Sequence, residues 1–493
     1  MSYTSLGYML FVACCLIFYY IFPKKHRWWV LLAASIGFYA IVCLKYISFV
    51  FVTAASTYAG GRILEAYANK HKAYIKSQKG IWPKEERDLY KAKVSRRKKW
   101  ITAAILLLNF GILGFLKYYN FFADALNVLL NPLGGGLPEL GLFLPLGISF
   151  YTFQSMSYTI DLYLRNIKVQ KSFLNFASYV SLFPQIVAGP IVRYEDVANE
   201  LESRTVNIAK ISAGIGLFVK GLAKKVLLAN NIGMVWTQIK AMDYSTISVA
   251  TAWLGIIAFA FQIYFDFSGY SDMATGLGKM LGFEFPKNFD HPYISKSISE
   301  FWRRWHITLG SWFRSYVYIP LGGNRNGNFK TYRNLFITWA LTGLWHGASW
   351  NFILWGLFFG VLIIIERLGF GKILEKLPSA VSMLYTFVMV LFGWVLFDTD
   401  TLADAGRYYA AMFGAGGSLV DSYARYTIAS NAVMLTLCIL ISGGLGSRLI
   451  SFCEEKNKRA SAVAGVAVKI GGLLICTAYL VGATYNPFLY FRF

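Results

Sequence analysis

Long apolar runs between clusters of basic residues constrain this chain more than any other feature of its sequence. A helix rises about 1.5 Å per residue, so it needs roughly 20 mostly apolar residues to cross the hydrocarbon core of a membrane. The sequence holds about eleven such runs and a short, doubtful twelfth at 334–345. They lie at 5–22, 28–44, 47–64, 100–116, 142–162, 211–228, 247–265, 334–345, 350–365, 381–397, 428–446 and 463–481. The pattern predicts an all-α polytopic membrane protein with a single membrane domain over residues 1–493.

The composition excludes a soluble or a disordered chain. Hydrophobic residues make up 56% of the sequence and charged residues only 15%, whereas soluble domains are roughly 25% charged. The formal charge of +23 would suggest nucleic acid in a soluble protein. In a membrane protein, however, Lys and Arg gather on the cytoplasmic side, so we expect a lipid bilayer and no nucleic acid as partner. The six cysteines show no CxxC spacing, which indicates neither a metal site nor a disulfide framework.

The basic clusters also predict the orientation of the chain. Pro-Lys-Lys-His at 23–26 follows the first apolar run, and the segment 65–99 contains twelve Lys or Arg against four Asp or Glu. Both segments fall on one side of the membrane if each run crosses it, and basic loops face the cytoplasm. The first run has no charged segment before it and no cleavage site after it, so we expect it to stay as an anchor. We predict a multi-pass protein of the cell (plasma or inner) membrane with its N-terminus outside.

Two stretches interrupt the simple pattern of apolar spans. Residues 173–193 are apolar but contain Pro184, Gly189 and Pro190, and residues 266–345 mix aromatic residues with charges. Broken backbone is tolerated at membrane depth only where protein or a water-filled cavity covers it. We therefore expect a cavity at these two stretches.

Two histidines in Trp-rich surroundings are the leading candidates for catalysis. An ionisable residue inside a membrane is costly and indicates function by default. His346 stands between Trp345 and Gly347, and His306 stands in a similar setting earlier in the chain. A neutral imidazole can accept a hydroxyl proton near pH 7, which the attack of an alcohol on an ester or thioester requires. The alternative is a buried histidine that is hydrogen-bonded between helices.

Basic residues around His306 indicate an anion site. If the run 301–313 is one helix, about 100° per residue places His306 on one face and aligns Arg303 with Arg314 on an adjacent face. Arg guanidinium groups suit phosphates, so Arg303, Arg314 and Arg325 are candidate ligands of a phosphate-bearing donor such as coenzyme A. The alternative places these arginines at the headgroup level of the cytoplasmic leaflet.

Asp266 and Asp272 form a polar patch at the end of a long apolar run. Buried carboxylates of this kind orient a partner or cap a helix more often than they catalyse, so we assign them structural roles. Asn288 begins the next polar motif of the same region. No Gly-x-Ser-x-Gly elbow, no phosphate-binding Gly-x4-Gly-Lys-Ser/Thr loop and no His-Glu-x-x-His pair occurs in the sequence. We expect no metal and no tightly bound cofactor.

Several motifs in this order resemble the membrane-bound O-acyltransferase (MBOAT) family, in the branch of alginate O-acetyltransferase. They are SFYTFQSMSYTIDLY from Ser149, FPQIVAGPIVR from Phe183, YFDFSGYSDMA from Tyr264, NFDHPYISKSISEFWRRWHITLGSWFRSYVYIPLGGNR from Asn288 and LTGLWHGASWNFILWG from Leu341. Together they cover residues 150–355, which we take as the catalytic core.

The resemblance implies a funnel of about eleven transmembrane helices with re-entrant helices around a central tunnel. It also implies that His346, in the Trp-His-Gly motif, is the essential catalytic residue and that His306 lies near the same tunnel. In such proteins an acyl group loaded in the cytoplasm crosses the membrane and reaches an acceptor outside, commonly through a partner acyltransferase.

The aromatic tail 486–493 adds a candidate acyl carrier. Similar tails occur on related transferases or their small companion proteins, where a tyrosine takes the acyl group in transit. The resemblance therefore implies that Tyr490 can accept acetyl and pass it on, after a base removes the phenol proton. The alternative is an aromatic anchor at the membrane interface.

We expect an O-acetyltransferase that moves acetyl from a cytoplasmic donor, acetyl-CoA or an acyl carrier, toward an extracellular or cell-wall polysaccharide. The expected partners are an extracytoplasmic acyltransferase and the polysaccharide acceptor. A second enzymatic possibility is D-alanyl transfer to teichoic acid, as in a more distant cousin of the branch. A polysaccharide transporter is the alternative that involves no catalysis.

Overall fold

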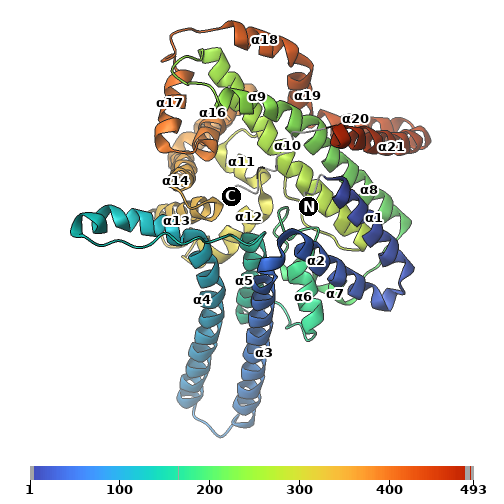
Figure 1. Cartoon of the computed structure of the whole chain (residues 1–493). Helices are drawn as coiled ribbons and strands as arrows, with labels where there is room; N and C mark the ends of the chain where they lie inside the picture. Colours follow the sequence, from blue (N-terminus) through green and yellow to red (C-terminus); the bar gives the residue numbers. More distant parts are fainter. Residues whose placement is uncertain (1–4, 165, 483–488, 490–493) are drawn as a thin grey trace. The chain divides into compact units, whose positions relative to one another are not determined.

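The computed structural model describes residues 5–164, 166–482 and 489, and these residues form helices and loops without a β-strand (Figure 1). Their contacts divide the chain into two compact units. The first consists mainly of Leu10–Thr205 with Leu281–Phe285, and the second mainly of Val206–Met280 with Pro286–Phe493. The single membrane domain stays a prediction, because such units reflect the density of contacts and not independent folding.

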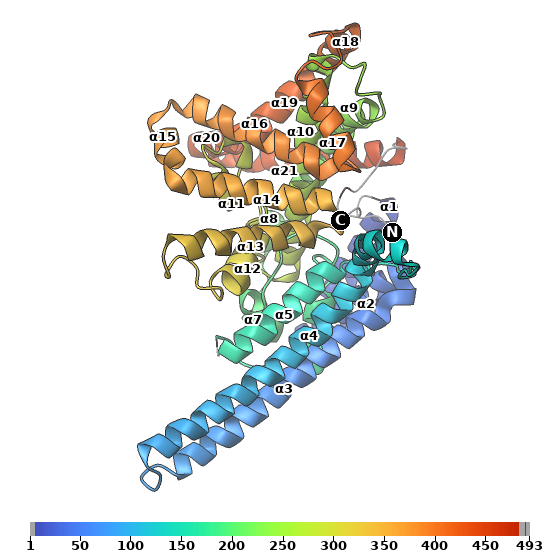
Figure 2. The ribbon, with the colours of Figure 1, turned by 90° about the vertical axis from the view of Figure 1, so that its left-hand side faces the viewer.

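The first unit is dominated by a long helical hairpin. Its helices are α1 (Leu6–Ile21), α2 (Arg27–Cys43), α3 (Ile47–Ser77), α4 (Lys84–Leu130), α5 (Ile148–Leu164), α6 (Phe173–Ser181) and α7 (Tyr194–Glu202). Figure 1 and Figure 2 show α3 and α4 side by side along their length. Pro83 precedes α4, and two glutamates in its first turn complement the positive end of the helix dipole. Each helix of the hairpin has an apolar half and a charged half, which meet near Glu65 and Lys99.

The Pro- and Gly-broken stretch 173–193 is covered by packed protein. α6 ends at Ser181, and nearly every residue from Leu182 to Val192 is buried. The Tyr179 hydroxyl donates a hydrogen bond of 2.9 Å to the carbonyl of Val192, which closes the loop on its own helix. A cavity lined by Ser178 has a volume of only about 10 Å³, the space of one water. Protein side chains thus cover this loop, as broken backbone at membrane depth requires.

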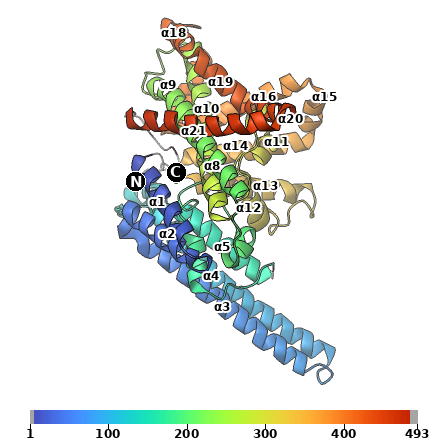
Figure 3. The ribbon, with the colours of Figure 1, turned by 90° about the vertical axis from the view of Figure 1, so that its right-hand side faces the viewer.

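The second unit contains every described residue that we single out as catalytic or donor-binding. Its helices are α8 (Ile208–Ala223), α9 (Asn230–Lys240), α10 (Val249–Leu281), α11 (Ile298–Arg304), α12 (Ile307–Phe313), α13 (Asn328–His346), α14 (Trp350–Ile365), α15 (Gly371–Lys376), α16 (Ser379–Asp398), α17 (Leu402–Met412), α18 (Ser422–Ser430), α19 (Ala432–Ser442), α20 (Leu445–Lys456) and α21 (Lys458–Gly482). Short helical turns join several of them, at Lys24–His26, Leu44–Tyr46 and Asn131–Leu133 in the first unit and at Lys224–Ala229, Pro292–Ile294, Arg314–Tyr318 and Glu366–Phe370 in the second. Figure 3 shows α21 passing alongside α8.

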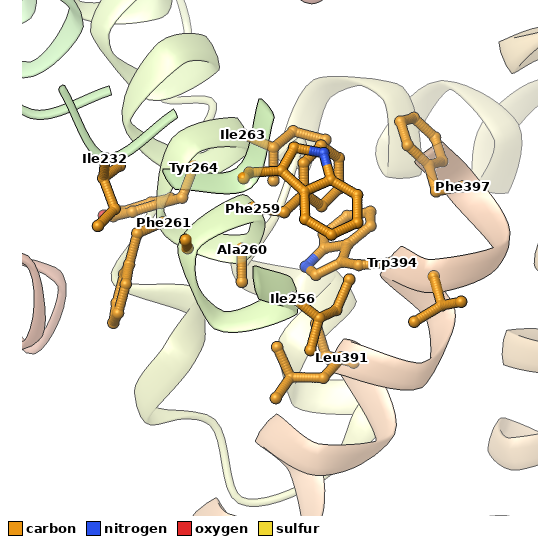
Figure 4. Close-up of a cluster of buried hydrophobic side chains, with 14 of the residues drawn as sticks. Ile232, Ile256, Phe259, Ala260, Phe261, Ile263, Tyr264, Leu391, Trp394 and Phe397 are labelled. Atoms are coloured by element: carbon orange, nitrogen blue, oxygen red, sulfur yellow. The ribbon is translucent and has the colours of Figure 1, made fainter. Parts of the chain in front are cut away.

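The core of the second unit is a cluster of aromatic and aliphatic side chains between α10 and α16. In Figure 4, Phe259 and Ile263 of α10 face Trp394 and Phe397 of α16. The rings of Phe259 and Trp394 meet edge to face with centroids 6.4 Å apart. Large buried rings therefore help to hold the two helices together.

Glycines bring α13 and α14 together as a tight hairpin (Figure 2). A Cβ atom at Gly343 would collide with the backbone carbonyl of Phe352, and one at Gly356 would collide with the carbonyl of Trp339. Because backbone cannot yield as a side-chain tip can, only glycine permits this spacing. The hairpin positions its connecting turn, which contains the Trp-His-Gly motif.

Six helical segments of the described chain are long and apolar enough to cross a membrane, and seven if the bent pair α18 and α19 forms one span. Nearly every predicted run is helical, but several lie in helices shorter than 18 residues, such as α1 with 16 residues and α5 with 17. Two further runs merge into the single segment Lys24–Ser77. The all-helical architecture is thus confirmed, whereas the count of eleven stays a prediction.

Candidate functional site

The run 301–313, which has helical character in the sequence, is broken at His306. α11 ends at Arg304 and α12 begins at Ile307, while His306 has left-handed backbone with φ 44° and ψ 53°. Asn288 explains the break, because its side-chain oxygen accepts hydrogen bonds from the Thr308 amide (3.3 Å) and hydroxyl (2.9 Å). Its backbone carbonyl also accepts the Ile307 amide at 3.0 Å. The condition of one continuous helix is therefore not met, because these bonds replace those within a helix and stabilise a strained residue.

Asn288 also orients the imidazole of His306. Its Oδ1 atom lies 3.1 Å from His306 Nδ1. The Thr308 amide can only donate, so the atom that it contacts must be the oxygen, and Nδ1 must then carry the proton. Nε2 is therefore the basic nitrogen of His306.

His346 is the last residue of α13, at the turn into α14. Its side chain is only 4% exposed and packs between the rings of Trp355 and Phe397, with centroids 4.8 and 5.4 Å away. Gly347 follows in extended conformation. The ring of Phe352 lies so close to it that a Cβ atom at this position would collide with the ring. The Trp-His-Gly motif thus ends one helix and fixes the imidazole among aromatic rings.

Trp345 brings the two histidines to one place. Its indole lies 6.1 Å from the ring of His306 and 4.9 Å from the ring of His346, centroid to centroid. The ring of Phe267, from α10, packs edge-on against His306 at 4.7 Å. Residues far apart in the sequence therefore share one aromatic site.

A cavity of about 520 Å³ opens beside this site. His306 lines it and is 1% exposed, whereas Arg303 and Arg314 line it and are exposed. The buried imidazole is thus at the base and the guanidinium groups are toward the mouth. Arg325 is exposed in the turn before α13 and is not among the lining residues. The cavity expected in 266–345 is present, with two of the three predicted arginines.

Arg367 and Glu366 are site residues that the sequence reasoning missed. Arg367 lines the cavity and is exposed. The buried carboxylate of Glu366 accepts hydrogen bonds from the Ile298 amide at 2.6 Å and the Ser299 amide at 3.0 Å, so it caps the start of α11 from a distant segment. In the sequence, Glu366 and Arg367 are a charged pair directly after the apolar run 350–365. Such a pair is typical of the ordinary end of a membrane span, so it did not indicate a site.

Asp266 and Asp272 form ion pairs on α10. Asp266 lies 2.7 Å from Lys225, and both side chains are buried. Asp272 lies 2.8 Å from Lys224, which also donates a hydrogen bond to Ser268. The two lysines come from the turn between α8 and α9. These contacts are those expected of structural carboxylates, although the sequence analysis did not identify the partners.

Leu489, the one described residue of the segment 486–493, contacts the same helix. The backbone amide of Leu489 donates a hydrogen bond of 3.0 Å to the second oxygen of Asp266, and Leu489 is buried. Tyr490, the candidate acyl carrier, lies outside the described residues.

Known proteins match this chain over most of its length. The sequence profile of MBOAT, the membrane-bound O-acyltransferase family, matches residues 165–396. The chain is 35% identical to a protein of Azotobacter vinelandii named "Probable alginate O-acetylase AlgI", over 98% of each chain. It is 31% identical to the "Peptidoglycan O-acetyltransferase" of Helicobacter pylori, over 80% of this chain and 83% of that one. It is 28% identical to the "Teichoic acid D-alanyltransferase" of Bacillus subtilis, over 51% and 68%.

The matched segment contains both histidines and all three arginines of the cavity. The similarity to the Azotobacter protein extends over almost the whole of both chains. The chain therefore belongs to the membrane-bound O-acyltransferase family, in its alginate O-acetyltransferase branch, and is an O-acetyltransferase.

Proposed function

We propose that this protein transfers acetyl from acetyl-CoA in the cytoplasm toward hydroxyl groups of an extracytoplasmic polysaccharide, through a partner acyltransferase. The observation that supports it best is the aromatic site of His306 and His346 beside an arginine-lined cavity. The relatives named as alginate O-acetylase and peptidoglycan O-acetyltransferase favour a glycan acceptor. The D-alanyltransferase resemblance covers about half of this chain, which favours acetyl over D-alanine.

His346 acts as the general base in this proposal. Its imidazole takes the proton of the accepting hydroxyl while the hydroxyl oxygen attacks the thioester carbonyl. The carbon–sulfur bond then breaks, and the thiolate of the donor takes up the proton as it leaves. Asn288 holds Nδ1 of His306, and we assign to this ring the role of positioning groups at the base of the cavity.

The donor occupies the cavity with its phosphates toward Arg303, Arg314 and Arg367. Guanidinium groups bind phosphate oxygens in a planar, two-bond geometry. The lining between these arginines and His306 is largely apolar, with Trp302 and Trp339 among its residues. Such a wall suits the uncharged arm that connects the phosphates to the acetyl thioester.

Substitution of the base tests the mechanism. We expect His346→Asn to lower acetyl transfer by about 10²- to 10⁴-fold, the contribution of a general base. The measurement is ester-linked acetate and ester-linked D-alanine on the polymer from cells in which the variant replaces the native protein. His26 is an exposed histidine in the short helical turn before α2, so His26→Asn is the matched control and should keep full activity.

Undiminished acetylation in His346→Asn, at equal protein level in the membrane, would show that the general-base role is wrong. Loss of D-alanine with unchanged acetate would favour the teichoic acid alternative.

We further propose that Tyr490 carries acetyl between the site and the partner. Leu489, its neighbour, is bound to Asp266 of α10, the helix that also supplies Phe267 to the aromatic site. Tyr490→Phe removes the hydroxyl and keeps the ring, so acetate transfer to the polymer should fall to background while an anchoring function survives. Tyr479→Phe on α21, where the ring is half exposed, is the control. Full activity of Tyr490→Phe would exclude the carrier role and leave the aromatic membrane anchor as the function of this residue.

A further inference from the structure

A second cavity, with a volume of about 240 Å³, lies within the first unit between α3, α4 and the segment that follows α5. Three of its lining residues are lysines, namely Lys72 on α3, Lys98 on α4 and Lys168 after α5. Among the lining residues described, the one carboxylate is Glu65, which already has Arg62 at 3.9 Å. The cavity therefore has an excess of positive charge, and acetyl transfer uses none of it.

Lys98 is the buried member of these three lysines, with only 7% of its surface exposed. Its ammonium lies 5.4 Å from the centre of the Tyr163 ring, a cation–π contact that holds it near the wall of the cavity. Leu64 and Leu162 supply apolar wall. A buried ammonium facing a cavity with apolar sides fits a ligand that joins an anionic group to an apolar body.

The position of the cavity along the hairpin indicates which ligand this is. On α3 the apolar half ends at Glu65, and on α4 it begins at Trp100, directly after the basic segment. Ile63 and Trp100 are exposed on the same two helices, as expected of side chains that face lipid at the interface. The lysines are thus at headgroup depth, on the side of the basic loop.

We propose that the cavity of Lys72, Lys98 and Lys168 binds a phosphate ester, and that this ester belongs to the headgroup of an anionic phospholipid. Lysine binds phosphate as a point charge, and basic pockets between helices on the cytoplasmic side bind anionic headgroups. The apolar walls accommodate the glycerol end of the lipid, and the exposed surface of α3 and α4 its chains.

The test uses the full-length protein in nanodiscs of phosphatidylcholine to which phosphatidylglycerol is added, with lipid retention measured by native mass spectrometry. Lys72→Gln/Lys168→Gln keeps the buried Lys98 and should weaken retention of phosphatidylglycerol about tenfold. Lys76→Gln/Lys99→Gln removes two exposed charges from the same helices, outside the cavity lining, and should leave retention unchanged.

Competition distinguishes the two sources of phosphate. Glycerol 3-phosphate and coenzyme A at millimolar concentration should not displace the lipid; displacement by either would assign the cavity to a soluble phosphate ester instead of a lipid. Equal retention in the cavity variant and the control, or equal retention of phosphatidylcholine and phosphatidylglycerol, would overturn the proposal. Binding is measured without turnover, so this result is independent of the outcome for acetyl transfer.

Discussion

At the scale of single residues, the site depends on side chains whose roles are set by distant partners. His306 was identified from its Trp-rich surroundings, but its left-handed backbone and its tautomer are set by Asn288. Periodicity within 301–313 could not reveal this, because local pattern does not report a hydrogen bond from another segment. Arg303 and Arg314 line one cavity although the helix between them is broken. Arg367 is distant in the sequence and lines the same cavity because the fold brings its segment there.

The arginines give a prediction at this scale. If the three guanidinium groups share the phosphates as proposed, Arg303→Gln, Arg314→Gln and Arg367→Gln should each raise the KM for acetyl-CoA roughly tenfold, with little change in kcat. The effect should shrink at high salt, since these side chains are exposed. Initial rates in membrane vesicles at several donor concentrations measure both constants.

Arg325→Gln is the control for this series, because Arg325 is an exposed arginine of the same unit that is not among the lining residues. If it raised KM as much as the other three, the arginines would act through general surface charge and the assignment of the cavity to the donor would be wrong.

At the scale of elements, the apolar runs predicted most of the helices. The runs 28–44, 350–365 and 381–397 correspond to α2, α14 and α16 within a few residues. Two departures stand out: hydrogen bonds to Asn288 separate α11 from α12, and α18 is bent by 64° against α19. Propensity and periodicity describe a segment alone, so they cannot predict where another segment takes over its amides.

The glycine contacts of α13 and α14 lead to a prediction about this hairpin. Gly356→Ala places a methyl group against the carbonyl of Trp339 and must push the helices apart. Because α13 ends at His346, a shift of about 1 Å should lower acetyl transfer up to about 10²-fold. Gly465→Ala on α21 has open space around its Cβ and should keep full activity. Equal activity of both variants, at equal abundance, would show that the close packing does not position His346.

At the scale of the whole molecule, the charge pattern predicts an orientation that labelling can measure. The turn between α3 and α4 should lie in the cytoplasm and the loop after α4 outside. In a variant without native cysteines, a membrane-impermeant maleimide should label Gly135→Cys in intact cells and Lys79→Cys only after permeabilisation. The reverse pattern would invert the orientation and with it the side from which the donor enters.

Glu366 and Arg367 are neighbours in the chain, yet they meet different parts of the molecule. Glu366 holds the start of α11 through two backbone amides, and Arg367 reaches the cavity mouth. α11 in turn ends two residues before His306. One short stretch of chain therefore supplies a guanidinium to the mouth of the cavity and holds the start of the helix that leads to the buried imidazole. A substitution that displaced this stretch would disturb the mouth and the base of the cavity together.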